Sequence, residues 1–330
     1  MPVKIFGPAV AIDQPIMETQ RLALIANPEA GARNALELVS KAHRELLGYE
    51  LDAIVPASRD ELSRVCQALS PKSHRAAIII GGDGTFNAAV QGLWKNSSHQ
   101  DHSVPIYAFP GGTANDLSAE LGLQQSFRQL QDLIDHRRLS PMDVITCNGV
   151  PFTTVAGIGV GASITQRFND IRQRSRVFRS LIRTLKTEVY TAMSANAIIT
   201  TRSYLHDVAI ESDSFNKRMR IAALFVCNQN KLGGSLRVGQ HNSNQDGIFG
   251  VLAVPADGPV SLLKTLLSIR SGQLPDHVIS FSARELSVRS TEDRDIPVFG
   301  DGEILLRSRN LDFKIFPRSL MVYRDKAELN

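Results

Sequence analysis

Short apolar runs alternate with helix-length stretches in the first part of the chain. The runs with the length of buried strands are 22–27, 49–55, 76–80 and 105–109. The stretches with helical character that follow them are 32–47, 59–69, 86–95 and 114–121. Buried strands that alternate with helices predict a parallel sheet with helices on both faces.

The pattern changes after residue 143, where strand-like runs follow one another without helices between them. These runs are 144–146, 152–155, 195–200, 208–211, 220–226, 250–254, 284–288, 303–307 and 311–316. Helical patterns occur mainly at 171–193 and 258–271. The sequence therefore predicts a mostly antiparallel β-sandwich as a second unit.

We expect a doubly wound, Rossmann-like α/β domain over residues 20–142 and a β-sandwich domain over 143–317, with a tail of about 318–330 that returns to the first domain. The length of 330 residues, which exceeds one ordinary core, favours two domains. The first twenty residues are unlike a signal peptide and are interpreted as a loose extension.

Composition narrows the cellular setting and the partners. The net charge of +4 is too small to argue for nucleic acid, and we expect none as a partner. Cys66, Cys147 and Cys227 lie far apart, which is typical of a reducing compartment and unlike a metal site or disulfide framework. No run approaches 18 apolar residues, so we expect no membrane span and a cytoplasmic protein.

Three glycine-bearing turns follow predicted strands, at residues 27–31, 81–85 and 110–116. The carboxyl ends of neighbouring parallel strands meet at one rim, so the three turns can converge there. Glycines that open a helix let backbone N–H groups face an anion, which indicates phosphate. Each turn alone is also compatible with ordinary turn chemistry and helix capping. Asp83 is an acid within this anion site, which would require a metal ion between the two charges.

A fourth glycine motif, FGDGE at 299–303, lies in the strand-rich part of the chain. Asp-Gly between apolar β runs is also a strong hairpin signal, so spacing alone favours a hairpin here. The same alternative applies to Asp246-Gly247.

Taken together, the motifs GGDGTFNAAV (81–90), PGGTANDLS (110–118) and DGE (301–303), after NPEAG (27–31), resemble the diacylglycerol kinase catalytic-domain family. The resemblance covers roughly residues 20–323 and includes bacterial soluble lipid kinases and sphingosine kinases. GGDGT alone also fits NAD kinases of the same superfamily, so the first domain is expected to be NAD kinase-like; PGGTANDLS favours the lipid kinases. The resemblance implies an ATP-dependent kinase that transfers the γ-phosphate to a hydroxyl of a diacylglycerol-like or sphingoid lipid.

The resemblance also implies roles for individual residues. The implied nucleotide contacts are Asn27, Gly31, Ser58, Gly82, Asp83, Gly84, Thr85, Gly112 and Thr113. Asp83, Asp116 and Asp143 match an acidic network that holds Mg²⁺-bound water near the phosphates. Asp246 resembles a structural Mg²⁺ site, although its loop lacks the usual Pro-x-Ala spacing.

On the acceptor side, Asp301 matches the general base of the family. Glu303 follows two residues later along a strand, so its side chain shares the face of Asp301 and could orient the base or a metal-bound water.

The stretch 167–186 holds seven basic residues and one acid, a net charge of +6. It is compatible with a solvated helix face, with contact of Arg176 and Arg179 to the ATP phosphates, or with attraction to an anionic leaflet. A bilayer-resident lipid substrate implies peripheral association with a membrane surface, and a homodimer is compatible with the family.

Two alternatives to a lipid kinase remain open. An NAD kinase is disfavoured by Thr113 to Asp116, and a non-catalytic lipid- or nucleotide-binding regulator is disfavoured by the presence of Asp83 and Asp301 together with Asp116 and Asp143. The identity of the lipid is hidden, because interchangeable apolar side chains line lipid pockets.

Overall fold

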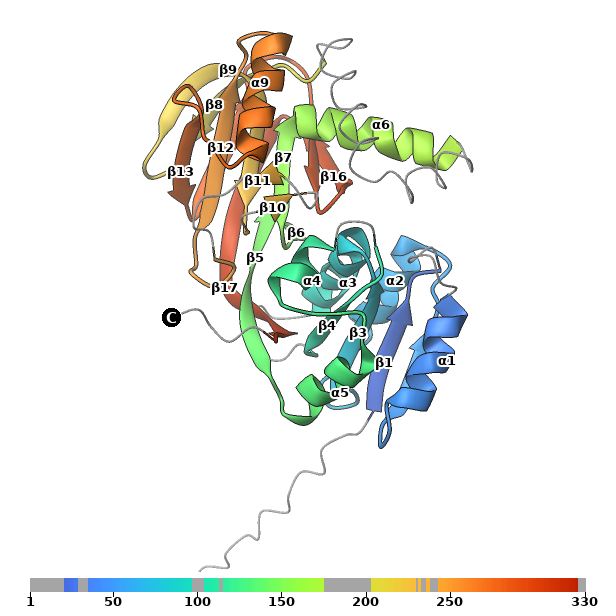
Figure 1. The fold of residues 1–330 in the computed structure, drawn as a ribbon. Helices are drawn as coiled ribbons and strands as arrows, with labels where there is room; N and C mark the ends of the chain where they lie inside the picture. Colours follow the sequence, from blue (N-terminus) through green and yellow to red (C-terminus); the bar gives the residue numbers. More distant parts are fainter. Residues whose placement is uncertain are drawn as a thin grey trace, which may run out of the picture.

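The computed structural model describes residues 21–28, 35–96, 104–112, 115–174, 203–229, 231–232, 236–237 and 243–325. Figure 1 shows two lobes, one with parallel strands between helices and one rich in antiparallel strands. Two long strands, β5 (Leu139–Cys147) and β17 (Asn310–Tyr323), run from one lobe into the other. The architecture confirms the expected combination of a parallel α/β unit and an antiparallel sandwich.

The parallel lobe has the strand order β2-β1-β3-β4. Its strands are β1 (Arg21–Ala26), β2 (Glu50–Ile54), β3 (Ala76–Gly81) and β4 (Ile106–Pro110). Its helices are α1 (Ala35–Glu45), α2 (Arg59–Gln67), α3 (Asp83–Asn96), α4 (Asp116–Glu120) and α5 (Phe127–Asp135). Every residue of β3 is buried, as expected for a central strand covered on both faces.

The second lobe is antiparallel throughout. Its remaining strands are β6 (Val150–Phe152), β7 (Val155–Gly159), β8 (His206–Glu211), β9 (Asn216–Cys227), β12 (Phe249–Pro255), β13 (Ile279–Ala283), β14 (Glu285–Ser290), β15 (Ile296–Gly300) and β16 (Glu303–Ser308). A separate small sheet pairs β10 (Lys231–Leu232) with β11 (Leu236–Arg237). The helices α6 (Val160–Arg174) and α9 (Pro259–Arg270) pack on this lobe.

The strands β5 and β17 tie the lobes together. They pair from Phe313 opposite Cys147 to Tyr323 opposite Leu139, with a register shift between Phe316 and Leu320. Near its end β17 also pairs with β4 in parallel. The last described part of the chain therefore adds a strand to the sheet of the first lobe.

The helix α3 begins at Asp83, three residues before the predicted start. The N–H groups of Thr85 and Phe86 both donate to the carbonyl oxygen of Gly82, at 2.9 and 3.0 Å. The glycine turn after β3 is thus also the first turn of α3, because these two bonds begin at Gly82.

Other elements also differ from the sequence pattern. The predicted strand 152–155 is interrupted between β6 and β7, because Thr153 and Thr154 turn to bind a carboxylate described below. α5, β10, β11, β13 and β15 were not among the predicted elements. The predicted strand 195–200 and the helix beyond residue 174 lie outside the described residues. None of the described helices has the length and apolar character needed to cross a bilayer.

Candidate active site

The glycine turns after β3 and β4 pack directly against each other. A Cβ atom at Gly112 would lie 2.3 Å from Cα of Gly82, closer than any side chain tolerates. The N–H of Gly111 also donates to the carbonyl oxygen of Gly81 at 2.8 Å. Position 112 therefore requires glycine for the two turns to meet at one rim, and a Cβ at Gly82 would be tight, at 3.0 Å from Cα of Gly112.

The end of β1 joins the same rim through Asn27. Its backbone N–H donates to the carbonyl oxygen of Ile80 at 3.0 Å, and its Nδ2 donates to Oγ1 of Thr85 at 2.8 Å. The structure thus brings Asn27, Gly82, Asp83, Gly84, Thr85 and Gly112 together at the carboxyl ends of neighbouring strands.

Asn115 shapes the turn before α4. It adopts a left-handed backbone with φ of 55°. Its Oδ1 accepts from the N–H of Gly112 at 2.7 Å, and its Nδ2 donates to the carbonyl oxygen of the same residue at 3.0 Å. Asparagine tolerates this conformation better than most residues, which accounts for its place in the motif.

Asp83 is a partly buried acid at the start of α3. Its two oxygens accept from the backbone N–H groups of Asp116 and Leu117, each at 3.1 Å, so Asp83 caps α4. The pKa of the Asp83 carboxyl is raised to about 6, mainly by burial and further by the negative charges of Asp116 and Asp301. The two backbone N–H donors oppose this rise. A cation at this position would relieve the unfavourable charge.

Asp301 lies in the turn between β15 and β16, with φ of 48°, and is 2% exposed. Its Oδ2 accepts from Asn87 Nδ2, Thr153 N and Thr153 Oγ1, at 2.8, 2.9 and 3.1 Å. Its Oδ1 accepts from the N–H of Thr154 at 2.9 Å and from the hydroxyl of Thr154. Five donors therefore surround this carboxylate, and Asn87 ties it to α3 of the other lobe.

Glu303 follows on β16 and faces the glycine turn. A Cβ atom at Gly84 would lie 3.5 Å from both Cγ of Glu303 and the backbone oxygen of Asp301. Oε2 of Glu303 accepts from Asn169 Nδ2 of α6 at 3.0 Å, and Oε1 lies 3.8 Å from Arg59 NH1 of α2. The DGE hairpin and the GGDGT turn thus lie against each other.

Several residues at this junction were missed by the sequence reasoning: Arg59, Asn87, Thr153, Thr154 and Asn169. Asn87 had a usable signal, because it lies four residues after Asp83 in the glycine motif, one helical turn along α3. Arg59 NH2 donates to Asn87 Oδ1 at 2.7 Å, a contact that no local pattern indicates.

Asp143 lies in a different cluster, at the crossing between the lobes. Its oxygens accept from the N–H groups of Gly247 and Arg318, each at 2.7 Å. Burial raises the pKa of the Asp143 carboxyl, and the negative charge of Asp246 adds to this effect. The charged neighbours of Asp143 are therefore Asp246 and Arg318, whereas those of Asp83 are Asp116 and Asp301.

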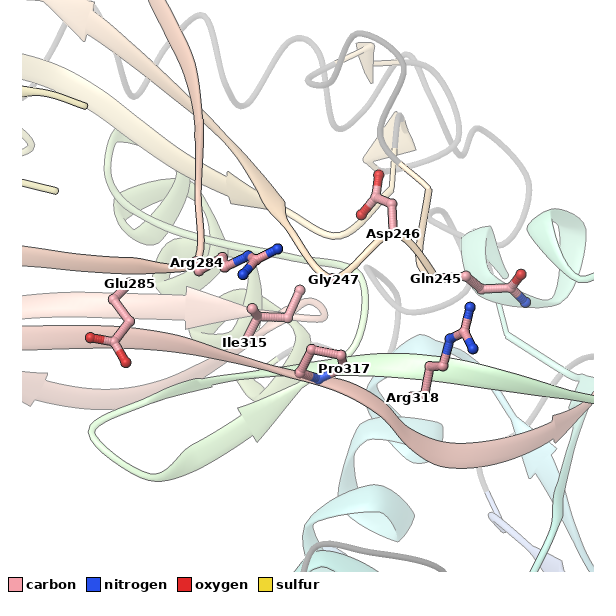
Figure 2. Close-up of a pocket in the computed structure, with 8 residues that line it drawn as sticks. All are labelled: Gln245, Asp246, Gly247, Arg284, Glu285, Ile315, Pro317 and Arg318. Atoms are coloured by element: carbon pink, nitrogen blue, oxygen red, sulfur yellow. The ribbon is translucent and has the colours of Figure 1, made fainter. Parts of the chain in front are cut away.

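Asp246 lines a cavity of about 390 Å³ beside this crossing (Figure 2). Its oxygens accept from the N–H groups of Ser243 and Ile248, at 3.2 and 3.1 Å. The other lining residues are Gln245, Gly247, Arg284, Glu285, Ile315, Pro317 and Arg318. None of them belongs to the glycine turns of the first lobe, so this cavity is separate from the rim.

Of the five remaining predicted site residues, the described part of the structure includes one. Ser58 is the N-cap of α2, and its hydroxyl accepts from the N–H of Glu61 at 3.1 Å. Gly31, Thr113, Arg176 and Arg179 lie outside the described residues.

The acids on the rim fit a hard cation. Within the described ranges, no group of three or more His, Cys, Asp and Glu side chains is arranged to hold a metal ion. Two acids alone can still suffice, because Mg²⁺ is commonly bound by one or two carboxylates and keeps several of its water ligands. The adjacent Asp83 and Asp116 would supply such carboxylate oxygens. The raised pKa of Asp83 supports the same fit.

Comparison with known families agrees with this architecture. Residues 21–147 match the model of the diacylglycerol kinase catalytic domain, and residues 154–324 match that of the YegS C-terminal NAD kinase beta sandwich-like domain. The second match alone covers more than half of the chain.

Individual relatives are more distant. A protein of Shewanella frigidimarina named "Probable lipid kinase YegS-like" is 26% identical over 205 residues, 62% of this chain and 62% of its own length. A protein of Bacillus subtilis named diacylglycerol kinase is 22% identical over 86% of this chain and 90% of its own length.

A crystal structure titled as a diacylglycerol kinase of Bacillus anthracis is similar in fold. It has a TM-score of 0.67 at 19% identity, with 93% of this chain and 97% of that chain covered. Because the two domain models match one after the other and together cover most of the sequence, the chain belongs to the diacylglycerol kinase catalytic-domain family.

Proposed function

We propose that the protein transfers the γ-phosphate of ATP to a hydroxyl group of a lipid of the diacylglycerol or sphingoid type. The observation that carries the proposal is the contact between the two motifs. Gly84 of the phosphate turn lies against Asp301 and Glu303, which follow more than 200 residues later in the other lobe. A kinase needs both a phosphate cradle and an acceptor-side carboxylate at one place.

On the nucleotide side, the glycine turns would hold the phosphates at the N-terminus of α3, where the helix dipole favours negative charge. Asp83 and Asp116 would hold Mg²⁺, which neutralises charge on the phosphate oxygens when it is bound. Asn27 and Thr85 would shape the cradle through their mutual hydrogen bond of 2.8 Å.

On the acceptor side, the lipid oxygen attacks the γ-phosphorus, the bond from phosphorus to the β-γ bridging oxygen breaks, and ADP leaves. We assign the acceptor proton to Asp301 as general base, as the family resemblance implies. Three of its five partners are N–H groups and two are the hydroxyls of Thr153 and Thr154. A hydroxyl proton can rotate away, so a threonine can yield its place to the substrate hydroxyl.

Glu303 would act beside the base. Its carboxylate lies over Gly84 and is oriented by Asn169 and Arg59. In this position Glu303 can hold a water molecule or the acceptor hydroxyl in line with the phosphate.

The test is a kinase assay with the full chain, radiolabelled ATP, Mg²⁺ and vesicles of a total lipid extract, followed by a panel of single lipids. We expect label in the lipid phase and none in NAD. Phosphorylation of NAD without any lipid product would overturn the class. The variant Asp301→Asn should still bind ATP while transfer falls by about 10²–10⁴-fold; wild-type activity in this variant would refute the base assignment.

A further inference from the structure

The helix α9 exposes two large apolar side chains on its outer face. Its sequence is PVSLLKTLLSIR, and the residues that it buries are Leu262, Thr265 and Ile269. On the opposite side, Val260 is 66% exposed and Leu267 is 49% exposed. The outer face of α9 therefore combines exposed apolar side chains with the exposed Lys264, which is typical of a helix that lies at a boundary between water and an apolar phase.

The helix α6 belongs to the same layer. Val160 and Ala162 of α6 and Leu262 and Ile269 of α9 contribute to one core cluster. Figure 1 shows both helices on the antiparallel lobe. Among the described residues, the exposed large apolar side chains are Leu36, Leu47, Val55, Ile171, Val260 and Leu267, and the last three of these lie on α6 and α9.

The charge of these two helices is strongly one-sided. The sequence of α9 contains Lys264 and Arg270 and no acid, and both basic residues are exposed. The sequence of α6 contains three arginines and one aspartate. The two helices therefore carry five basic residues and one acid, a net charge of +4, which is complementary to an anionic surface.

The same layer touches the acceptor side of the candidate active site. Asn169 of α6 donates to Glu303, and Arg307 of β16 donates from NH2 to Oε1 of Gln166 of α6 at 2.9 Å. Phe299, before the DGE turn, belongs to the core cluster to which α6 and α9 contribute, and Ile304, after the turn, is partly buried and packs against that cluster. A surface that binds these helices is therefore adjacent to the hairpin of Asp301.

We propose that α6 and α9 form the face by which the protein docks on an anionic lipid bilayer, with α9 lying along the interface. Val260 and Leu267 enter the boundary between head groups and acyl chains, while Lys264 and Arg270 contact anionic head groups. The proposal rests on the proposed lipid kinase function, because docking here presents a lipid hydroxyl to the DGE hairpin.

The experiment measures co-sedimentation of the full chain, without ATP, with vesicles of phosphatidylcholine alone or with roughly a third phosphatidylglycerol. One variant combines Val260→Ser with Leu267→Ser, and another combines Lys264→Gln with Arg270→Gln. The matched control combines Leu36→Ser with Leu47→Ser, two apolar residues of the other lobe that are 61% and 70% exposed. All six positions are on the surface, and thermal unfolding verifies that each variant is folded.

We expect the wild type to bind the anionic vesicles and each α9 variant to partition about tenfold more weakly, with the control unchanged. The basic pair should matter only for anionic vesicles. The proposal is overturned if the wild type binds neither vesicle, if the control loses binding equally, or if the α9 variants bind as the wild type does. It is also overturned if sedimentation velocity shows that the α9 variants abolish a dimer and leave vesicle binding intact, because the partner of the outer face is then a second copy.

The outcome is separable from the fate of the proposed function. Vesicle binding that depends on α9, without phosphorylation of any lipid, would refute the kinase proposal alone. Phosphorylation of lipid in vesicles at the wild-type rate by both α9 variants would refute docking alone. A detergent-dispersed lipid should be phosphorylated equally by the wild type and both variants.

Discussion

Two aspartates, Asp83 partly buried and Asp301 buried, face the candidate active site from opposite lobes, and their surroundings differ. Asp83 has two backbone donors and two acidic neighbours, and burial raises its pKa to about 6. Asp301 has five donors, from α3 and from the turn between β6 and β7. The charge of Asp83 is compensated by two donors only, whereas that of Asp301 is surrounded by five.

The difference indicates separate tasks. An acid whose charge is only partly compensated, beside a glycine turn suited to phosphate, is suited to a cation that arrives with the nucleotide. A fully hydrogen-bonded acid holds its neighbours in place before any substrate arrives. Asp301 would therefore join the lobes as well as serve as the proposed base. Loss of its carboxylate should destabilise the fold, whereas loss of the Asp83 carboxylate should not.

The largest expected effect on stability comes from Asp301→Asn. An amide keeps one acceptor oxygen and turns its NH₂ group toward N–H and O–H donors, so buried donors lose their partners. We expect the free energy of unfolding to fall by about 3 kcal/mol or more in denaturant titrations. The control is Glu303→Gln, two residues away and partly exposed, for which we expect a change below about 1 kcal/mol. If the two substitutions lowered the free energy of unfolding equally, the five hydrogen bonds of Asp301 would not stabilise the fold more than the contacts of Glu303 do.

The glycine turns around Asp83 could be predicted from the sequence, whereas the surroundings of Asp301 largely could not. The glycine turns follow their own strands, so local pattern and the geometry of parallel sheets place them at one rim. The partners of Asp301, by contrast, are 214, 148 and 147 residues away, at Asn87, Thr153 and Thr154. Chain pattern carries no information on such pairings, and only the resemblance singled out Asp301.

The fold shows the same limit. The alternation of strands and helices in the first lobe was predicted because each period is local. The sequence analysis expected a tail of about 318–330 to return to the first domain, but it did not predict that β17 pairs with β5 and β4, because this pairing depends on residues that are distant in sequence. The separation of Asp143 from Asp83 also depends on this path, through the bond from the N–H of Arg318.

A second prediction concerns the packing that holds the Asp83 side together. Gly112→Ala places a Cβ 2.3 Å from Cα of Gly82, so the two turns must separate. We expect a loss of about 2 kcal/mol in unfolding free energy and weaker ATP binding by calorimetry. Gly84→Ala is the control for stability, since its Cβ would meet only ordinary contacts at 3.5 Å or more. Unchanged ATP binding in Gly112→Ala would show that the nucleotide does not use this pair of turns.

A third prediction uses pH to test the charge of Asp83. An acid with a higher pKa in the folded state keeps its proton longer there. Its stabilising contribution is therefore complete below about pH 4 and is lost as the pH rises through about 6. Between pH 4 and 7 the wild type should lose about 2–3 kcal/mol relative to Asp83→Asn, as measured by denaturant titration at several pH values. Mg²⁺ should diminish this loss in the wild type alone, and a difference independent of both pH and Mg²⁺ would contradict the assignment.

The smallest expected effect concerns Arg59, which contacts both sides of the comparison. Arg59 NH1 lies 3.8 Å from Glu303 Oε1, and both side chains are partly exposed. A double-mutant cycle of Arg59→Gln and Glu303→Gln should therefore give a coupling energy of only about 0.5 kcal/mol. Arg64→Gln is the matched control on α2, where the guanidinium donates from Nε to the backbone oxygen of Asp60 in the same helix, and its coupling to Glu303 should be zero. A coupling of several kcal/mol at Arg59 would mean that the exposed ion pair joins the lobes. A weak coupling leaves that task to the buried bond between Asn87 and Asp301, since a contact shielded from water contributes more than one that water screens.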